Sequence, residues 1–481
     1  MKEHHASRPG IRELARKFRS GELTPEQLTR NLLERIERLN PELHALNIVT
    51  AERALEEAAR ATADLRAGRD PGPLCGIPYV AKDLFDVQGQ PTTAGTSLLA
   101  DNVAAEDCPA IRRLATAGMV LLGKTHTVQF AFGGVGVNHD QGTPKNPWKT
   151  RHYIPGGSSS GAGVAVAAGL APVALGTDTG GSVRIPAALN GLVGLKTTVG
   201  RISRAGVYPL SWSLDSVGPL ATLVEDAWLL YGALAGPEPG DETTWGIAPP
   251  DREPPPEEGA QGLRVGICET VMFDDADEEV EQAVRRAAEK FSELGARVFS
   301  LQVPQVEEIF SLKKRDRLVA AEALAFCGRL LDEHSDRLDP VVTPRLEAGR
   351  ELSASEYVQL LAGWRRIRAS LAHTLAGVDV LLSPTTPIMA RPLEMVDASP
   401  ESYAHHNRLY LRNTSVANNL GLCAVSVPCG LTSDGLPIGL MIHAAPFAEA
   451  LALKAARAYE TACRDEAWQP LLPPGIYGQD G

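Results

Sequence analysis

The sequence lacks the cysteine and histidine patterns of a disulfide framework or a metal centre. Its 481 residues include seven cysteines, an odd number, and no two of them form a C-x-x-C pair. None of the 11 histidines stands in an H-E-x-x-H motif. Thiols in this arrangement are typical of a reducing compartment. We therefore expect neither structural disulfides nor a bound metal.

An excess of positive charge is also missing, as are long apolar runs. The chain carries 47 Lys and Arg against 59 Asp and Glu, a net charge of −12, whereas nucleic acids and anionic membranes attract basic surfaces. The N-terminal stretch has no apolar segment typical of a signal peptide. The longest weakly polar run, 161–176, is short for a membrane span and contains Pro172. We expect a cytoplasmic protein that binds neither nucleic acid nor a membrane.

What is present is the composition of a globular protein with a large core, 44% hydrophobic and 22% charged. The residues at 24–27, Thr-Pro-Glu-Gln, form a capping box that predicts a helix, and a second helix is predicted over 51–67. After these two predicted helices, apolar segments along the rest of the chain predict buried strands. The strands alternate with helices, which favours an α/β fold. These segments are 76–87, 119–125, 263–268, 296–303, 378–386, 424–430 and 437–444.

The organisation of the chain changes in its middle. Residues 236–262 are rich in Pro, Glu and Gly, which predicts an exposed linker. The segment 263–345 after it contains strand and amphipathic-helix patterns of its own. We expect this segment to form a peripheral subdomain of the main fold.

Two glycine–serine clusters and one lysine are the candidates for chemistry. Ser158 lies in PGGSSSGAG, Ser182 lies in ALGTDTGGSVRIPA, and Lys82 lies between apolar neighbours in YVAKDLFDV. Each feature alone is typical of an ordinary turn or a solvated charge. The clusters match neither the nucleophile-elbow motif G-x-S-x-G nor a complete phosphate-binding motif. His152 is a rival base, but the sequence offers nothing to orient it.

Together, these residues resemble the amidase signature family. The resemblance is nearly continuous from Pro155 to Arg201 and includes the spacing of the two serines. It extends to CGIPYVAKDLFDV around Lys82, to NPWKTRHYIPGG, and to LPIGLMI near the C-terminus. The resemblance implies a single domain over 1–481, with a mixed central β-sheet covered by helices on both sides.

The resemblance also implies the roles of individual residues. Ser182 matches the nucleophile, Lys82 matches the base, and Ser158 matches a bridging serine whose preceding peptide bond is cis. The backbone N–H groups of Thr179, Gly180, Gly181 and Ser182 match the oxyanion hole. Such a hole needs several N–H groups aimed at one point, and glycine leaves that approach open.

The chemistry that follows is an amide hydrolysis without a cofactor. A serine hydroxyl becomes a good nucleophile when a base removes its proton, and burial favours the neutral form of a lysine. We expect Lys82 to accept a proton from Ser158, Ser158 to accept one from Ser182, and Ser182 to form an acyl-enzyme. The expected partner is a small-molecule amide, anilide or carbamate, and a homodimer is left open.

Two functions share this motif set. The first is a free-standing amidohydrolase acting on a non-peptide C–N bond of a small amide or carbamate. The second is the glutaminase subunit of a tRNA-dependent amidotransferase, which carries an acid for the glutamine amino group. This chain has Leu411 and Arg412 near that place, which favours the first function. Ala131 and Phe132 match residues that line the acyl pocket.

Overall fold

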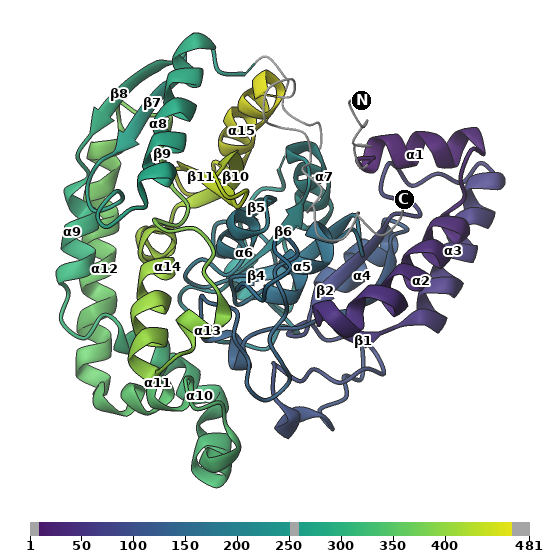
Figure 1. Ribbon diagram of the computed structural model, residues 1–481, viewed down its shortest axis with the longest axis horizontal. Helices are drawn as coiled ribbons and strands as arrows, with labels where there is room; N and C mark the ends of the chain where they lie inside the picture. The colour runs from purple at the N-terminus through teal and green to yellow at the C-terminus, as the bar shows by residue number, and fades with distance from the viewer. Residues whose placement is uncertain (1–8, 251–258, 464–481) are drawn as a thin grey trace.

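The computed structural model describes residues 9–250 and 259–463. One sheet of 11 strands, in the order β1-β3-β2-β4-β6-β5-β10-β11-β9-β7-β8, runs through it (Figure 1). The strands are β1 (Leu46–Val49), β2 (Pro78–Lys82), β3 (Val120–Thr125), β4 (Val173–Asp178), β5 (Val193–Lys196), β6 (Ser216–Ala221), β7 (Arg264–Cys268), β8 (Arg297–Leu301), β9 (Val380–Pro384), β10 (Cys423–Leu431) and β11 (Pro437–Ala444). The sheet is mixed, because β2 is parallel to β3 and β4 whereas β4 is antiparallel to β6.

Helices surround this sheet. The α-helices are α1 (Ile11–Ser20), α2 (Pro25–Leu43), α3 (Ala51–Arg66), α4 (Pro109–Thr116), α5 (Ser160–Ala167), α6 (Arg184–Leu189), α7 (Val224–Leu234), α8 (Glu278–Glu293), α9 (Pro304–Ser311), α10 (Arg317–His334), α11 (Thr343–Glu347), α12 (Ala354–Leu375), α13 (Leu393–Val396), α14 (Pro400–Leu420) and α15 (Glu449–Cys463). The 3-10 helices are η1 (Ser97–Leu99), η2 (Gln129–Ala131), η3 (Glu242–Thr244), η4 (Ser335–Arg337) and η5 (Ala348–Glu351).

Both faces of the sheet are covered, as expected. On one face, α1, α4, α7, α8 and α15 contribute side chains such as Trp228 and Phe291 to the largest core cluster. On the other face, α2, α3 and α5 pack near β1–β4, and α9, α12 and α14 pack near β9–β11. The N-terminal helices and the pair α9–α12 lie at opposite ends of the molecule (Figure 1). Within the described residues, no helix combines the length and apolar composition that a membrane crossing requires.

Local sequence signals specify several of these elements. Helix α2 begins at the predicted capping box, in which Thr24 Oγ1 accepts from the N–H of Gln27 and the Gln27 side chain accepts from the N–H of Thr24. Helix α3 lies where the second helix is predicted. Each apolar segment predicted as a strand contains one, from β2 to β11. Strands β1, β4, β5 and β6 were not predicted.

The middle of the chain joins the same sheet. Strand β7 pairs in parallel with β9, and β8 pairs with β7, so part of the segment 263–345 forms one edge of the sheet. In the predicted linker, Asp241 and Thr244 are buried, and Asp241 Oδ2 accepts from the N–H of Arg204 at 2.7 Å. Residues 251–258 of that linker lie outside the described residues. The division of the chain into domains stays a prediction.

Candidate active site

Lys82 is the last residue of β2, and its side chain meets Ser158. Val80 packs against α5 on one face of the sheet, and the two-residue period of a strand places Lys82 on that same face. Lys82 Nζ lies 2.7 Å from Ser158 Oγ and 2.8 Å from Thr177 Oγ1. All three atoms are buried. Ser158 precedes α5, and the Gly157–Ser158 peptide bond is cis.

Ser182 reaches the same place from β4. Strands β2 and β4 are parallel neighbours, so their carboxyl ends meet at one edge of the sheet, where α/β proteins commonly bind ligands. Strand β4 ends at Asp178, and the turn that follows carries Ser182. The N–H of Ser159 donates to the carbonyl oxygen of Ser182 at 3.2 Å. The structure therefore brings the segments of Lys82, Ser158 and Ser182 together.

The surroundings of Lys82 favour its neutral form. Burial lowers the pKa of Lys82 to about 7, and the nearby charges of Asp215 and Asp178 oppose that shift. Desolvation is the dominant effect because an ammonium group loses its hydration in the interior. At neutral pH, a substantial share of this amine is unprotonated and able to accept a proton.

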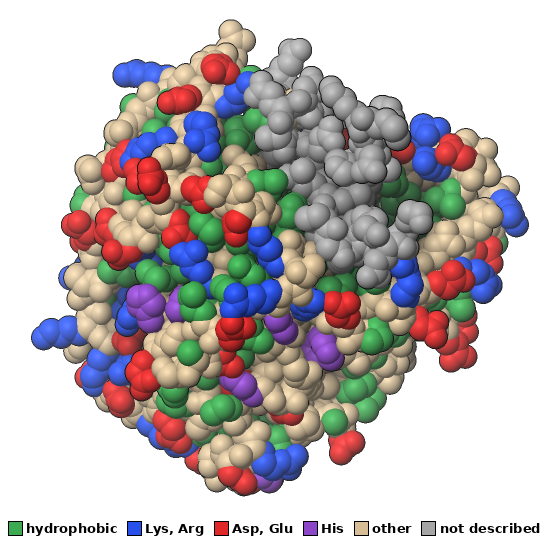
Figure 2. Space-filling model, viewed as in Figure 1, with side chains coloured by type: hydrophobic (Ala, Val, Ile, Leu, Met, Phe, Trp, Pro, Cys, Tyr) green, Lys and Arg blue, Asp and Glu red, His purple; other side chains and the backbone are tan. Residues whose placement is uncertain are grey.

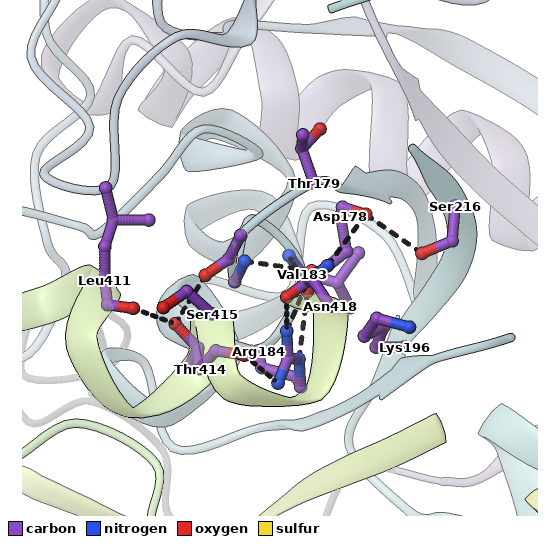
Figure 3. Close-up of polar contacts among 12 residues, drawn as sticks. Asp178, Thr179, Val183, Arg184, Lys196, Ser216, Leu411, Thr414, Ser415 and Asn418 are labelled. Atoms are coloured by element: carbon purple, nitrogen blue, oxygen red, sulfur yellow. Dashed lines mark hydrogen bonds and ion pairs between the residues drawn. The ribbon is translucent and has the colours of Figure 1, made fainter. Parts of the chain in front are cut away.

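A buried ion pair fixes the turn that carries Ser182. Asp178 accepts hydrogen bonds from the N–H groups of Gly181 at 2.9 Å and Val183 at 3.1 Å. Its carboxylate also pairs with Arg184 at 2.9 Å, and both side chains are fully buried (Figure 3). Burial alone would raise the pKa of Asp178, but the charge and hydrogen bonds of Arg184 outweigh it and lower the pKa to about 2. The carboxylate therefore stays ionised and holds the turn.

Helix α14 closes the other side of the turn. Thr414 Oγ1 donates to the carbonyl oxygen of Gly180 at 2.7 Å, and Arg184 donates to the carbonyl oxygen of Thr414 at 2.8 Å (Figure 3). Gly181 has φ +141°, and a Cβ there would lie 2.2 Å from Thr414 Oγ1 and 2.7 Å from the Ile185 side chain. Only glycine fits this close approach.

The four amides predicted as an oxyanion hole have different surroundings. The N–H of Gly181 is bound by Asp178, so it helps to fix the turn. Thr179, Gly180 and Ser182 line a cavity, and their N–H groups have no acceptor within the described residues. The hydroxyl of Thr179 donates to Asp215 at 2.5 Å.

The cavity in front of Ser182 has a volume of about 540 Å³, the size of a small-molecule site. Ala131 and Phe132, predicted from the sequence to line an acyl pocket, do lie in its wall. Further apolar wall residues are Leu210, Leu214, Val271, Phe310, Val319, Trp364 and Leu411. The wall also contains Arg412, which the sequence placed near the substrate, and charged side chains that the sequence did not place there: Glu307, Arg315, Asp316, Arg345 and Arg408.

His152, the rival base, lies elsewhere. Its Nε2 is 3.3 Å from the carbonyl oxygen of Pro144, and it is not part of the cavity wall. The positioning residues Asp178, Arg184 and Thr414 were not predicted. Asp178 and Arg184 stand close to Ser182 in the same motif, so an acid and a base on either side of the serine could have predicted an ion pair there. Thr414 lies more than 200 positions away, and nothing in the sequence links it to Ser182. Within the described residues, no cluster of three or more His, Cys, Asp or Glu side chains could hold a metal.

Comparison with known proteins identifies the family of this chain. The model of the Amidase family matches residues 27–453. A 2-amino-5-chloromuconic acid deaminase of Comamonas testosteroni is 39% identical, over 93% of this chain and 94% of that protein. A glutamyl-tRNA(Gln) amidotransferase subunit from Cyanothece sp. (strain PCC 7425 / ATCC 29141) is 35% identical, over 94% of this chain and 97% of that protein.

Among solved structures, the native peptide amidase of Stenotrophomonas maltophilia is similar with a TM-score of 0.80 and 29% identity. The similarity covers 96% of this chain and 98% of that one. The chain belongs to the amidase family and has the fold of amidase-signature enzymes. It is a hydrolase of that family, whose members act on C–N bonds.

Proposed function

We propose that this chain is a free-standing amidohydrolase that uses Ser182 as nucleophile, Ser158 as proton relay and Lys82 as base. The observation that carries the proposal is the 2.7 Å contact between Lys82 Nζ and Ser158 Oγ. The lowered pKa of Lys82, about 7, supports it, because only a neutral amine accepts a proton. Neutral Lys82 takes the Ser158 proton while Ser158 takes the proton of Ser182.

Ser182 Oγ then attacks the amide carbonyl, and the C=O π electrons move to oxygen. The N–H groups of Thr179, Gly180 and Ser182 are available to stabilise that oxyanion, while Gly181 holds the turn through Asp178. The C–N bond breaks, the leaving nitrogen takes the proton back through Ser158, and an acyl-enzyme remains. Water activated by the same relay releases the acid and restores Ser182.

The substrate class is a small linear amide or carbamate. The cavity of about 540 Å³ holds a compact acyl group, and Ala131 leaves more space beside Ser182 than a bulky residue would. The 39% identical relative is named as a deaminase of an amino-substituted organic acid, so amino-substituted acids belong in the substrate panel with amides, anilides and carbamates.

The glutaminase subunit of a tRNA-dependent amidotransferase is the second candidate. Amidotransferase subunits of this kind are 35% identical over nearly the whole chain. Against this function, Leu411 and Arg412 stand in the cavity wall where an acid for the glutamine amino group is expected. A guanidinium repels the α-ammonium group of glutamine, so the free-standing hydrolase is the better supported function.

The test is a set of variants assayed on a simple amide. We expect Ser182→Ala to lower kcat by roughly 10⁴-fold or more, with Ser158→Ala and Lys82→Ala each costing several orders of magnitude. The double variant Ser158→Ala/Lys82→Ala should be little worse than either single one, since the relay acts as a unit. A sulfonyl fluoride should label Ser182 in the wild type. His152→Ala is the control and should keep its activity; near-normal turnover by Lys82→Ala would reject lysine as the base.

A further inference from the structure

The cavity wall has a charge opposite to that of the whole protein. The chain carries a net charge of −12, and Figure 2 shows acidic and basic side chains mixed over the face in view. The cavity, by contrast, is lined by four arginines and only two acids: Arg315, Arg345, Arg408, Arg412, Glu307 and Asp316. Both acids and Arg408 are exposed, so water screens their charges, whereas Arg315, Arg345 and Arg412 are half-buried. The space in front of Ser182 therefore attracts anions.

Arg412 is the arginine of this wall that has a buried nitrogen without a hydrogen-bond partner among the described residues. Its side chain is 13% exposed, and its nearest carboxylate oxygen, on Asp275, lies 3.8 Å away on a side chain that is 83% exposed. Nε donates to Asn413 Oδ1 at 3.1 Å, but Nη2 is buried and has no hydrogen-bond partner within the described residues. A buried donor without an acceptor is unfavourable, so this nitrogen is a place for a ligand's acceptor.

Arg412 lies on the helix that contacts the turn carrying Ser182. It lies on α14 between Leu411, whose Cδ2 a Cβ on Gly180 would meet at 3.4 Å, and Thr414, which donates to the Gly180 carbonyl. Arg412 and Ser182 line the same cavity. A substrate whose carbonyl is at Ser182 can therefore reach Arg412 with another of its groups inside the same cavity.

Arg345 adds a second uncompensated charge to this wall. Its guanidinium lies over the Phe132 ring, 4.0 Å from the centroid, and donates to the carbonyl oxygen of Phe132. Within the described residues, the group that acts on the charge of Arg345 is the phenol of Tyr403, and no Asp or Glu pairs with it. These contacts hold the guanidinium in place while leaving its charge to a ligand.

We propose that the substrate is an amide whose acyl group carries a carboxylate, and that Arg412 pairs with that carboxylate. Arginine suits this task because its planar fork matches a carboxylate and binds it in a bidentate way. The inference rests on the proposed amidohydrolase and names its substrate class, a monoamide of a dicarboxylic acid. It makes Arg412 a specificity determinant without a role in bond cleavage.

The test compares two amides that differ in charge. Glutaramate carries a free carboxylate, and pentanamide is its uncharged counterpart of the same chain length. We expect the wild type to prefer glutaramate in kcat/KM, and Arg412→Gln to lower that preference by roughly 10- to 100-fold, the effect of losing a charge-assisted hydrogen bond. The loss should fall mainly on KM, and Arg412→Lys should recover part of it.

Arg329→Gln is the matched control, because it removes one positive charge from α10 at a side chain that is 85% exposed. It should leave the preference unchanged. Binding is measured separately, by calorimetry with glutarate and the Ser182→Ala protein, and should weaken when Arg412→Gln is added. A wild type with no preference for glutaramate that also fails to bind glutarate overturns the inference. If both amides are cleaved through Ser182 in that case, the proposed amidohydrolase stands.

Discussion

At the scale of single residues, the proposed relay depends on one lysine whose charged form is disfavoured by burial. Lys82 has no carboxylate within hydrogen-bond distance in the described structure; its Nζ contacts the hydroxyls of Ser158 and Thr177. Charges of Asp215 and Asp178 reach it from further away and partly restore its basicity. The pKa of about 7 is thus the result of strong desolvation and weaker attraction.

The pH dependence of the proposed reaction follows from that balance. The base works when neutral, so kcat/KM should rise as the pH passes through about 7 and level off above it. Asp215→Asn removes a charge that raises the pKa of Lys82, so the rise should move to lower pH. The measurement is a pH profile of kcat/KM with a neutral amide. Asp101→Asn, at an exposed position, is the control; a rise near pH 10 in the wild type would contradict a desolvated base.

At the scale of elements, helix α14 and the turn after β4 act as one unit. Arg184 on α6 joins them, since it pairs with Asp178 and also donates to the carbonyl oxygen of Thr414 and to Asn418 Oδ1 at 2.7 Å. Asn418 in turn donates to Asp178 Oδ1 at 2.8 Å. The position of Ser182 is therefore set by a helix that begins more than 200 residues later in the chain.

Breaking this unit should cost stability as well as activity. Arg184→Met leaves the Asp178 carboxylate buried without its cation, so we expect the free energy of unfolding to fall by about 3–5 kcal/mol. Urea unfolding measures this loss, and amide hydrolysis by the folded fraction should drop too. Arg69→Met removes an exposed pair with Asp64 and should change stability by no more than about 0.5 kcal/mol. A similar small change for both variants would show that the buried pair does not hold the turn.

At the scale of the whole molecule, the site is assembled from segments that are distant in the sequence. Lys82, Ser158 and Ser182 come from the first half of the chain, whereas Arg345 and Arg412 come from the second. The sheet joins the two halves of the chain where β5 pairs with β10. The two strands are antiparallel, and Val425 lies opposite Leu195. The cavity wall therefore depends on the complete sheet.

This assembly leads to a prediction about autonomy. The purified chain alone should hydrolyse a simple amide, because the whole proposed relay comes from one polypeptide. It should release ammonia from glutamine roughly 10- to 100-fold less efficiently than from glutaramate, which has the same chain without the α-ammonium group, because Arg412 repels that group. Ammonia release and amide hydrolysis are measured side by side. An inert lone chain that becomes a glutaminase when amidotransferase subunits and tRNA are added would favour the second candidate function.

The sequence by itself determined the family and the elements with local signals. The serine-containing tract from Pro155 to Arg201 resembles one family over its full length, and the family model confirms that membership. The capping box at Thr24 predicted α2, because its hydrogen bonds join residues three apart in the chain. Local chemistry of this kind needs no knowledge of distant segments.

Only the tertiary structure decided what forms within the glycine-rich tract and what lines the cavity. All eight residues of α5 and all six of β4 are buried, so neither element has the polar face whose period distinguishes a helix from a strand. The surroundings of Arg412 depend on contacts between α14 and remote loops. Whether a charged side chain is solvated at the surface or is available to bind a ligand depends on its burial and on its partners. The tertiary structure determines both the burial and the partners.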